Sequence, residues 1–234
     1  EKGAGCLVVE RKRRSAWPQN VARVEVGDTL QALGDLAHYR RRSVDAVERQ
    51  CAIAITGSCG KTTVKEMTAA IMRRHFPAGP DHPENAVLAT KGNLNNLIGL
   101  PLTLLPITPR QRVAVLEMGM NAPGEIAQMA RAAEPDICCI TNVLGVHLEG
   151  LGDIDGVAKA KGELFTEAGR EATLIVNLDD EKICGLVADE SRPMVTFSVS
   201  SDEADLYAAD IVTSGSAIGF TLHCGAEFAS VTLQ

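Results

Sequence analysis

The sequence predicts an α/β protein whose mostly parallel sheet is covered by helices on both faces. Short apolar runs alternate with amphipathic runs from residue 51 to about residue 180, as in chains that build parallel sheets. A glycine-rich turn at residues 57–60 links the first apolar run to a helical pattern. We expect residues 1–46 to be the end of a small α/β N-terminal domain and residues 47–234 to be a central domain.

The first strong helical pattern is VGDTLQALGDLAHYRRR, residues 26–42. Asp28 occupies an N-cap position and Gln31 follows three residues later, the order of a capping box. Leucines then recur at helical spacing. We expect this helix to close the first domain and the polar residues 43–50 to connect it to the second.

The central domain is predicted from four strand-like and three helix-like segments. The strands are expected at residues 51–55, 113–119, 136–143 and 173–180, and the helices at residues 62–75, 123–133 and 156–168. Val64, Met67 and Ile71 are expected to lie on one face of the first of these helices. Asn121 is a candidate cap of the second. Residues 217–234 are typical of a hairpin that turns near Gly225.

Composition excludes several classes of protein. The 234 residues carry a net charge of −7 and only 3% aromatic side chains, which argues against nucleic-acid binding. Seven cysteines without a C-x-x-C pair indicate reduced thiols in a cytoplasmic protein. No apolar run is long enough to span a membrane and no signal peptide is evident, although the chain begins at Glu1 rather than methionine.

Charge is unevenly distributed along the chain. Residues 1–50 hold ten Lys and Arg against seven Asp and Glu, whereas the remainder holds thirteen against twenty-three. A basic first segment would suit a phosphorylated ligand, and a solvated surface explains it equally well.

The loop TGSCGKTT has the context of a phosphate-binding loop, since it follows a strand and opens a helix. It departs from the usual G-x-x-x-x-G-K-[ST] spacing, because Ile55 stands where a glycine is expected. The Lys61 ammonium could reach the β- and γ-phosphates, and the Thr62 hydroxyl could bind Mg²⁺. The alternative is a tight turn with a surface lysine. The predicted nucleotide contacts are Gly57, Ser58, Cys59, Gly60, Lys61, Thr62 and Thr63.

Two further residues follow predicted strands and so should lie at the same edge of the sheet. Glu117 ends one strand, where a carboxylate could hold Mg²⁺ or could simply cap a helix or form a salt bridge. His147 follows the next strand, and a lone histidine is more often structural than a ligand.

Lysines and asparagines complete the set of candidates. Lys159 and Lys161 lie two residues apart on a predicted helix and so point to different sides. Lys161 falls beside the apolar stripe, and Lys159 is expected to be solvated. The segment TKGNLNNLIGLPLTLL contains Asn93, Asn95 and Asn96, whose amides suit polar substrates or phosphates, or else turns around neighbouring glycines.

Taken together, the segments TGSCGKTT, TKGNLNNLIGLPLTLL, EMGMNAPGEIAQMA, NVLGVHLEGLG and VAKAKGELF resemble the Mur ligases of peptidoglycan synthesis. The resemblance runs from about residue 24 to residue 180. It implies a P-loop ATPase-like central domain and ATP-dependent amide formation through an acyl phosphate. Phosphoryl transfer of this kind needs alignment and neutralised charge more than covalent catalysis.

The resemblance also implies roles for individual residues. Lys61 would hold phosphate, and Thr62, Glu117, His147 and Lys161 would serve two Mg²⁺ sites as metal ligands, with Lys61, Glu117, His147 and Lys161 as the catalytic set. Lys161 matches a lysine that family members carbamylate with CO₂, which turns a cation into a metal-binding anion. Asn95 and Asn96 match a substrate-facing segment.

The substrates implied by the resemblance are ATP, UDP-N-acetylmuramoyl-tripeptide and D-alanyl-D-alanine. We expect a monomer with no nucleic-acid partner and no membrane insertion. Because the family's enzymes have three domains, the chain is expected to lack the C-terminal domain and not to complete ligation by itself. The alternatives are a sister ligase of the Mur or folylpolyglutamate type with another amine acceptor, and a P-loop module without catalysis.

Overall fold

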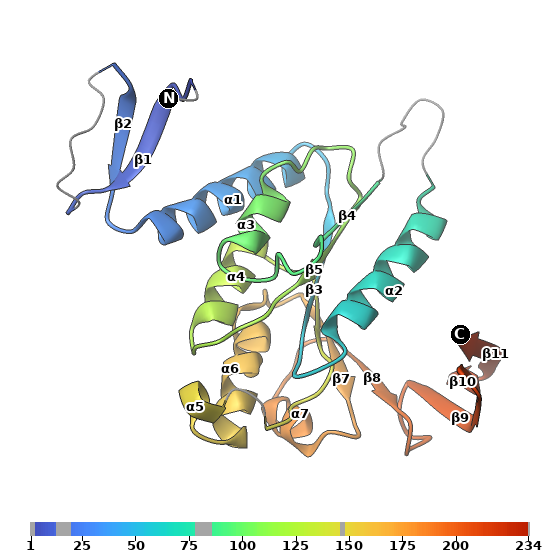
Figure 1. Cartoon of the computed structure of the whole chain (residues 1–234). Coiled ribbons are helices and arrows are strands. Elements are labelled where there is room, and N and C mark those ends of the chain that lie inside the picture. The colour runs from blue at the N-terminus through green and yellow to red at the C-terminus, as the bar shows by residue number, and fades with distance from the viewer. Residues whose placement is uncertain (1–2, 13–19, 78–85, 146–147, 234) are drawn as a thin grey trace.

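The chain folds around a nine-stranded, mostly parallel sheet with helices on both faces, which confirms the predicted class (Figure 1). The computed structural model describes residues 3–12, 20–77, 86–145 and 148–233. The strands are β1 Cys6–Glu10, β2 Ala22–Val26, β3 Cys51–Thr56, β4 Val87–Ala89, β5 Val113–Glu117, β6 Ile137–Ile140, β7 Thr173–Asn177, β8 Met194–Ser198, β9 Leu206–Ser214, β10 Ala217–Cys224 and β11 Glu227–Leu233. The helices are α1 Thr29–Asp45, α2 Lys61–His75, α3 Gly99–Leu104, α4 Glu125–Ala133, α5 Leu148–Leu151, α6 Ile154–Glu167 and α7 Glu181–Leu186.

The strand order of the large sheet is β11-β10-β9-β8-β7-β6-β3-β5-β4. Strands from β4 to β9 run parallel, and β9, β10 and β11 are antiparallel. The chain passes from β3 to β4 and β5 on one side and then to β6 and β7 on the other. The carboxyl end of β3 is therefore a topological switch point, where open α/β sheets bind ligands.

The central strands are buried on both faces, as continuous apolar runs in parallel sheets require. On β3, Ile53 and Ile55 pack with Ala69 of α2, whereas Ala54 faces the larger core beneath α4 and α6. That larger core includes Leu164, which lies on the buried stripe of α6 together with Val157 and Phe165 as predicted. This packing fixes the helices on both faces of the sheet relative to the carboxyl end of β3.

The helix α1 is anchored to the central sheet rather than only to the N-terminal strands. It packs against α3 and α4. Arg41 is buried, with its guanidinium 2.9 Å from Asp45 and donating to the Gln50 carbonyl at 3.0 Å. Asp28 caps the helix as predicted, but the Gln31 side chain donates to Asp35 instead of returning to the cap. The domain boundary after residue 46 remains a prediction.

The structure differs from the local sequence pattern in two helices. Met67 and Ile71 of α2 are 43% and 62% exposed, and the buried side of α2 is instead formed by Lys65 and Ala69. Residues 43–45 belong to α1 rather than to a connection, because the helix continues to Asp45. In both cases the tertiary packing, and not the local pattern, decides the outcome.

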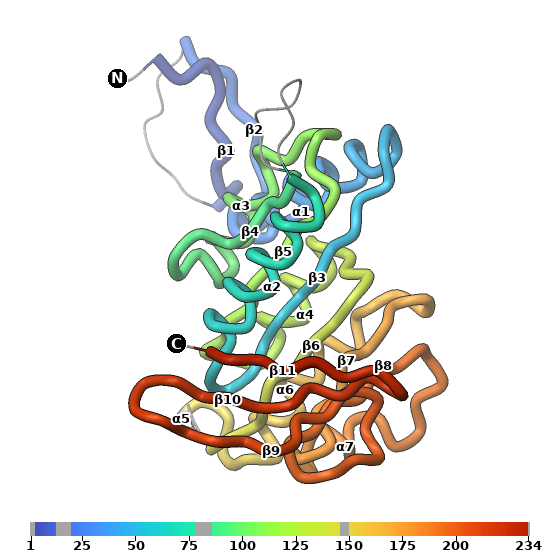
Figure 2. Tube along the Cα trace, turned by 90° about the vertical axis from the view of Figure 1, so that its right-hand side faces the viewer, coloured from blue at the N-terminus to red at the C-terminus, as the bar shows by residue number. Residues whose placement is uncertain are grey.

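The hairpin predicted near Gly225 is present, and β9 adds a third strand to it. Gly225 has φ +56° between β10 and β11. Figures 1 and 2 show these three strands as a layer beyond the end of the parallel sheet. Among the described residues, no helix is long and apolar enough to cross a membrane.

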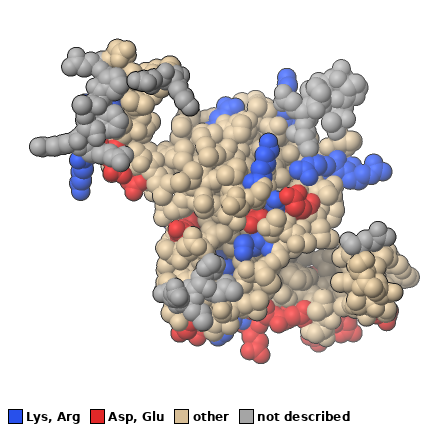
Figure 3. All heavy atoms as spheres, in the orientation of Figure 1, with Lys and Arg blue, Asp and Glu red and all other residues tan. Residues whose placement is uncertain are grey.

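Charged side chains are unevenly distributed on the face drawn in Figure 3. Asp and Glu gather along its lower edge, Lys and Arg gather at the upper right, and both kinds occur in the centre. Arg73 and Arg74 lie in the last turn of α2, where their positive charges interact favourably with the negative end of the helix dipole. The acidic edge disfavours the docking of a polyanion there.

Candidate functional site

The loop between β3 and α2 has a backbone that glycine adopts most readily. Gly57 has φ +148° and Gly60 has φ +78°. The segment after β6 supports the loop from one side. The Thr141 hydroxyl donates to the Cys59 carbonyl at 2.7 Å, and the Cys59 N–H donates to Asn142 Oδ1 at 3.0 Å. The loop is therefore a preformed turn rather than a loose connection.

The N-terminus of α2 opens toward the site without a side-chain cap, since its N-cap residue Gly60 makes no such hydrogen bond. Uncapped N–H groups and the helix dipole attract an anion. The amides of Ser58 and Cys59 already donate to Asn142, at 2.9 and 3.0 Å. We therefore expect the amides from Gly60 onward, more than those earlier in the loop, to meet a phosphate.

Lys61 folds back over the loop that precedes it. Its ammonium donates to the carbonyls of Gly57 at 2.8 Å and Ser58 at 3.3 Å. Both acceptors are neutral carbonyls, so the cation has no carboxylate partner among the described residues. A phosphate oxygen would be a stronger partner for the same ammonium.

Glu117 lies at the carboxyl end of β5 and is 2% exposed. Its Oε1 accepts from the Thr62 hydroxyl at 3.1 Å and from Asn95 Nδ2 at 2.7 Å. Its Oε2 is buried and has no hydrogen-bond partner among the residues that the structure describes. An unpaired buried carboxylate oxygen is costly unless a cation or donor reaches it. The donor set of one carboxylate and one hydroxyl fits Mg²⁺, which completes its shell with water and phosphate.

The two candidate asparagines have different roles. Asn95 reaches Glu117 across Gly119, where an added Cβ would lie 3.1 Å from the Asn95 side chain. Asn96 Oδ1 accepts from the N–H groups of Ile98 and Gly99 at 3.1 and 2.9 Å, so it supports the start of α3. Asn95 is thus part of the carboxylate cluster, and the Asn96 oxygen serves turn chemistry.

Lys161 is 2% exposed on α6, whereas Lys159 is exposed as predicted. No hydrogen bond or ion pair within the described part of the chain engages the Lys161 ammonium. Burial, and to a smaller extent the positive charge of Lys61, together lower the pKa of Lys161 to about 8. Burial together with a lowered pKa makes this amine a candidate for a chemical role.

The structure brings Thr62, Glu117 and Asn95 into direct contact and places Lys61 close enough to Lys161 to affect its pKa. His147 lies outside the described residues. Within the described ranges, no group of three His, Cys, Asp or Glu side chains could hold a metal ion. Mg²⁺ can also be bound by hydroxyl and phosphate oxygens, so a magnesium site does not require three such side chains.

Sequence reasoning missed Lys65, the largest fully buried side chain. Its ammonium donates to the Thr90 carbonyl at 2.9 Å and to Glu66 Oε1 at 2.5 Å. The Thr90 hydroxyl in turn accepts from the Glu117 N–H at 3.0 Å. Lys65 therefore ties α2 to the segment that orients Glu117. The available signal was its position one helical turn after Lys61.

Glu163 was also missed, two residues after Lys161. Its carboxylate accepts from the N–H groups of Gly124 at 2.7 Å and Ala127 at 3.0 Å, and so caps α4 from a neighbouring helix. Asn121 is therefore not the cap, contrary to the sequence-based prediction. The loop that follows Glu117 is fixed to the helix that carries Lys161.

The change Glu163→Gln is expected to lower the free energy of unfolding by about 1–2 kcal/mol, because two charge-assisted bonds to the α4 N-terminus weaken. Urea denaturation would measure this loss. Glu171→Gln, at an exposed site, is the matched control and should change stability by less than about 0.5 kcal/mol. Equal effects in the two variants would contradict a capping role for Glu163.

Comparison with protein families assigns the chain that carries this site to a family. Residues 55–233 match the model of the Mur ligase middle domain, which is more than half of the chain. The chain belongs to the Mur ligase family. The match begins at Ile55, one residue before the loop, and includes Glu117, Lys161 and the antiparallel strands.

Two Mur ligases are similar in sequence to this chain over most of its length. A UDP-N-acetylmuramoyl-tripeptide–D-alanyl-D-alanine ligase from Escherichia coli is 38% identical over 226 residues, which is 94% of this chain and 45% of that protein. The enzyme of the same name from Bacillus subtilis is 40% identical over 158 residues, 68% of this chain and 32% of that protein. The chain spans about half the length, or less, of these curated relatives.

Solved structures agree with this assignment. A MurF crystal structure from Acinetobacter baumannii superposes with a TM-score of 0.83 at 31% identity, covering 97% of this chain and 46% of that one. A MurF ligase from Thermotoga maritima in complex with ADP gives a TM-score of 0.82 at 23% identity, covering 98% and 49%. The second likeness shows the fold alone.

Proposed function

We propose that this chain is the nucleotide-binding part of an ATP-dependent ligase that joins D-alanyl-D-alanine to UDP-N-acetylmuramoyl-tripeptide in peptidoglycan precursor synthesis. Family membership and the names of the relatives support this reaction. The observation that carries the proposal is the Glu117 carboxylate. One of its oxygens is held by Thr62 and Asn95, and the other is buried without a partner in the described part of the chain.

The loop and α2 would bind the phosphates of ATP. The uncapped helix N-terminus supplies N–H donors, and Lys61 can exchange its carbonyl partners for phosphate oxygens. These groups would neutralise charge on the transferred phosphoryl group while the substrate carboxylate attacks it. The acyl phosphate so formed would then react with the amine of D-alanyl-D-alanine, with release of phosphate.

Two magnesium ions are proposed as cofactors. Thr62 and Glu117 would hold one ion, and His147 and Lys161 would serve the second. Bound Mg²⁺ supplies positive charge that aligns and neutralises phosphate oxygens. The unpaired Glu117 oxygen supports the first site, since a cation there would remove the cost of burying it.

Lys161 is proposed to act as a carbamate. Its neutral amine would attack CO₂, forming an N–C bond and releasing a proton to water, and the product is an anion. With a pKa of about 8, the amine is roughly one quarter neutral at pH 7.5, against about one part in a thousand for an ordinary lysine. Burial thus favours the reactive form, and the carbamate would remove the repulsion between an ammonium and nearby metal ions.

Asn95 and Asn96 are proposed to face the peptide substrate, Asn95 through the cluster that it shares with Glu117. We also propose a monomer that acts in the cytoplasm, without a nucleic-acid partner or membrane insertion. All seven cysteines are free thiols, which supports a reducing compartment.

Titration of the chain with ATP and Mg²⁺ tests the nucleotide site. Lys61→Ala is expected to weaken ATP binding by about tenfold or more in calorimetry, because a charge-assisted bond to phosphate is lost. Lys159→Ala removes an exposed lysine from α6 and should leave the affinity unchanged. Equal affinities of wild type and Lys61→Ala would contradict the proposed phosphate contact.

The ligation step is tested by phosphate release from a protein of the relatives' full length that contains this chain. Release should require ATP, UDP-N-acetylmuramoyl-tripeptide and D-alanyl-D-alanine together. Preference for a single amino acid over D-alanyl-D-alanine would favour a sister ligase instead. Full activity of Lys161→Ala would contradict the carbamate, and its rescue by a short carboxylic acid would support it.

A further inference from the structure

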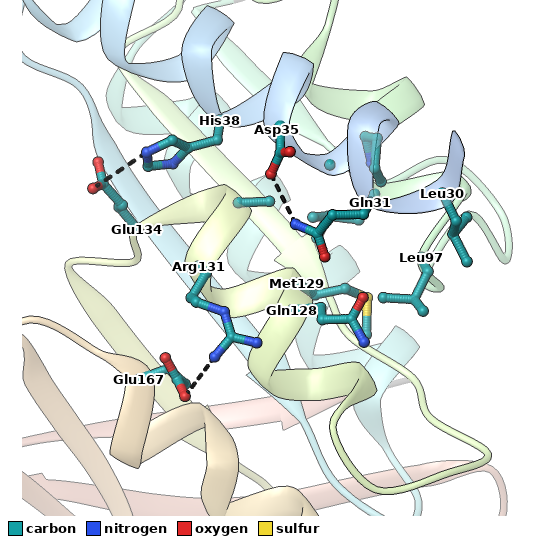
Figure 4. Close-up of a pocket in the computed structure, with 14 residues that line it drawn as sticks. Leu30, Gln31, Asp35, His38, Leu97, Gln128, Met129, Arg131, Glu134 and Glu167 are labelled. Atoms are coloured by element: carbon teal, nitrogen blue, oxygen red, sulfur yellow. Dashed lines mark hydrogen bonds and ion pairs between the residues drawn. The ribbon is translucent and has the colours of Figure 1, made fainter. Parts of the chain in front are cut away.

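A second cavity lies on the face of the sheet opposite α2, between α1, α3 and α4 (Figure 4). Its volume is about 350 Å³, within the range of small-molecule sites. Leu30, Leu97 and Met129 cluster at one end in Figure 4. This apolar end could receive a hydrocarbon or aromatic group of comparable size.

Gly34 borders this cavity from the middle of α1. Glycine destabilises a helix interior because it loses more backbone entropy than other residues. No atom lies within 4 Å of the place where a Cβ of residue 34 would be, so packing within the chain does not require glycine here. A side chain at this position would instead project into the cavity. Glycine at residue 34 therefore leaves the space open for another molecule.

The other end of the cavity is polar and incompletely paired. His38 Nδ1 is buried without a hydrogen-bond partner among the described residues, and His38 Nε2 lies 3.9 Å from Glu134 Oε1. A proton on Nε2, facing that carboxylate, leaves the Nδ1 lone pair as an acceptor. An incoming N–H donor would satisfy it.

Charge at this end favours a cation. The titratable lining residues include three carboxylates against one guanidinium. Arg131 is engaged by Glu167 at 2.8 Å, which leaves Asp35 and Glu134 as the less compensated anions. Among the described residues, Asp35 accepts only from the neutral Gln31 amide, and the guanidinium of Arg42 lies 3.9 Å from Glu134 Oε1. Figure 4 shows these carboxylates on the His38 side of the cavity.

We propose that this cavity binds a small organic cation with an apolar or aromatic body at the Leu30–Met129 end and an ammonium or guanidinium head near Asp35, His38 and Glu134. The site is separate from the nucleotide loop, so it does not depend on the function proposed above. One wall of the cavity is linked to the candidate functional site, because Leu97 lines the cavity and follows Asn95 and Asn96 directly in the chain.

The test compares 3-phenylpropylamine with 3-phenylpropionate, two probes of the same shape and opposite charge. In NMR titrations of the 234-residue chain, the amine is expected to bind about tenfold more tightly than the carboxylate, the ratio that one favourable ionic contact gives. Chemical-shift changes should map to α1, α3 and α4. Glu134→Gln should reduce the preference for the amine by several-fold.

Gly34→Leu fills the cavity and should abolish binding while leaving the thermal midpoint equal or higher. Gly185→Leu is the matched control, since Gly185 is another helical glycine with open space around its Cβ position. Retained binding in Gly34→Leu, equal affinity for both probes, or no binding of the amine would each overturn the proposal. If Gly34→Leu fails to fold, the Glu134→Gln titration decides between the same outcomes.

Discussion

Gly57→Ala is expected to lower the free energy of unfolding by at least about 3 kcal/mol and to abolish ATP binding. A Cβ at this position would lie 1.9 Å from the Thr141 hydroxyl oxygen, and the backbone has φ +148°. The backbone strain alone costs about 1–3 kcal/mol. If Thr141 moves away, its hydrogen bond to the Cys59 carbonyl is lost, which costs about 1 kcal/mol more. Urea denaturation and calorimetry with ATP would measure both effects.

Gly60→Ala separates the two causes. Gly60 also has a positive φ, +78°, but no atom lies within 4 Å of its Cβ position. Its replacement should therefore cost only the left-handed backbone term, about 1–2 kcal/mol. Similar losses in the two variants would contradict the interlock between Gly57 and Thr141. Adding Thr141→Ala to Gly57→Ala should recover part of the lost stability.

The sequence predicted the layers of this fold because each central strand is a short run of apolar residues between turns. The run at 51–55 became β3, and the run at 113–119 became β5 up to Glu117. The placement of Glu117 followed from this, since a residue that ends a parallel strand must lie at the ligand-binding edge. Neither conclusion required knowledge of a distant contact.

Contacts between elements could not be predicted in the same way. The local pattern places Met67 and Ile71 on one face of α2, yet both are exposed, and Lys65 is buried where the Thr90 carbonyl and Glu66 accept from its ammonium. Likewise, Glu163 caps α4 from α6, which replaces the local cap expected from Asn121. A charged side chain is stable in the interior only when a partner is near it, and contacts with partners from other elements cannot be read from the local sequence.

Lys161→Met is expected to stabilise the ligand-free chain by about 1–3 kcal/mol at pH 7 and to remove the proposed ligase activity from a protein of the relatives' full length that contains this chain. Burial and the charge of Lys61 lower the pKa of Lys161 from 10.5 to about 8. The folded state thus carries an ammonium that it disfavours relative to the unfolded state. Methionine fills similar volume without charge, so the penalty disappears along with the amine that the proposed carbamate requires.

The pH dependence of this gain identifies its cause. Below pH 8, Lys161 is protonated in both states and the full penalty applies. Between pH 8 and 10.5 the unfolded state holds the extra proton, so the wild type gains stability as pH rises and the advantage of methionine shrinks. Urea denaturation at pH 7 and pH 10 would show this trend, and Lys159→Met, at an exposed site, should show neither gain nor trend. A gain in Lys161→Met that stays constant across this range would mean that improved packing, and not the buried charge, stabilises the variant.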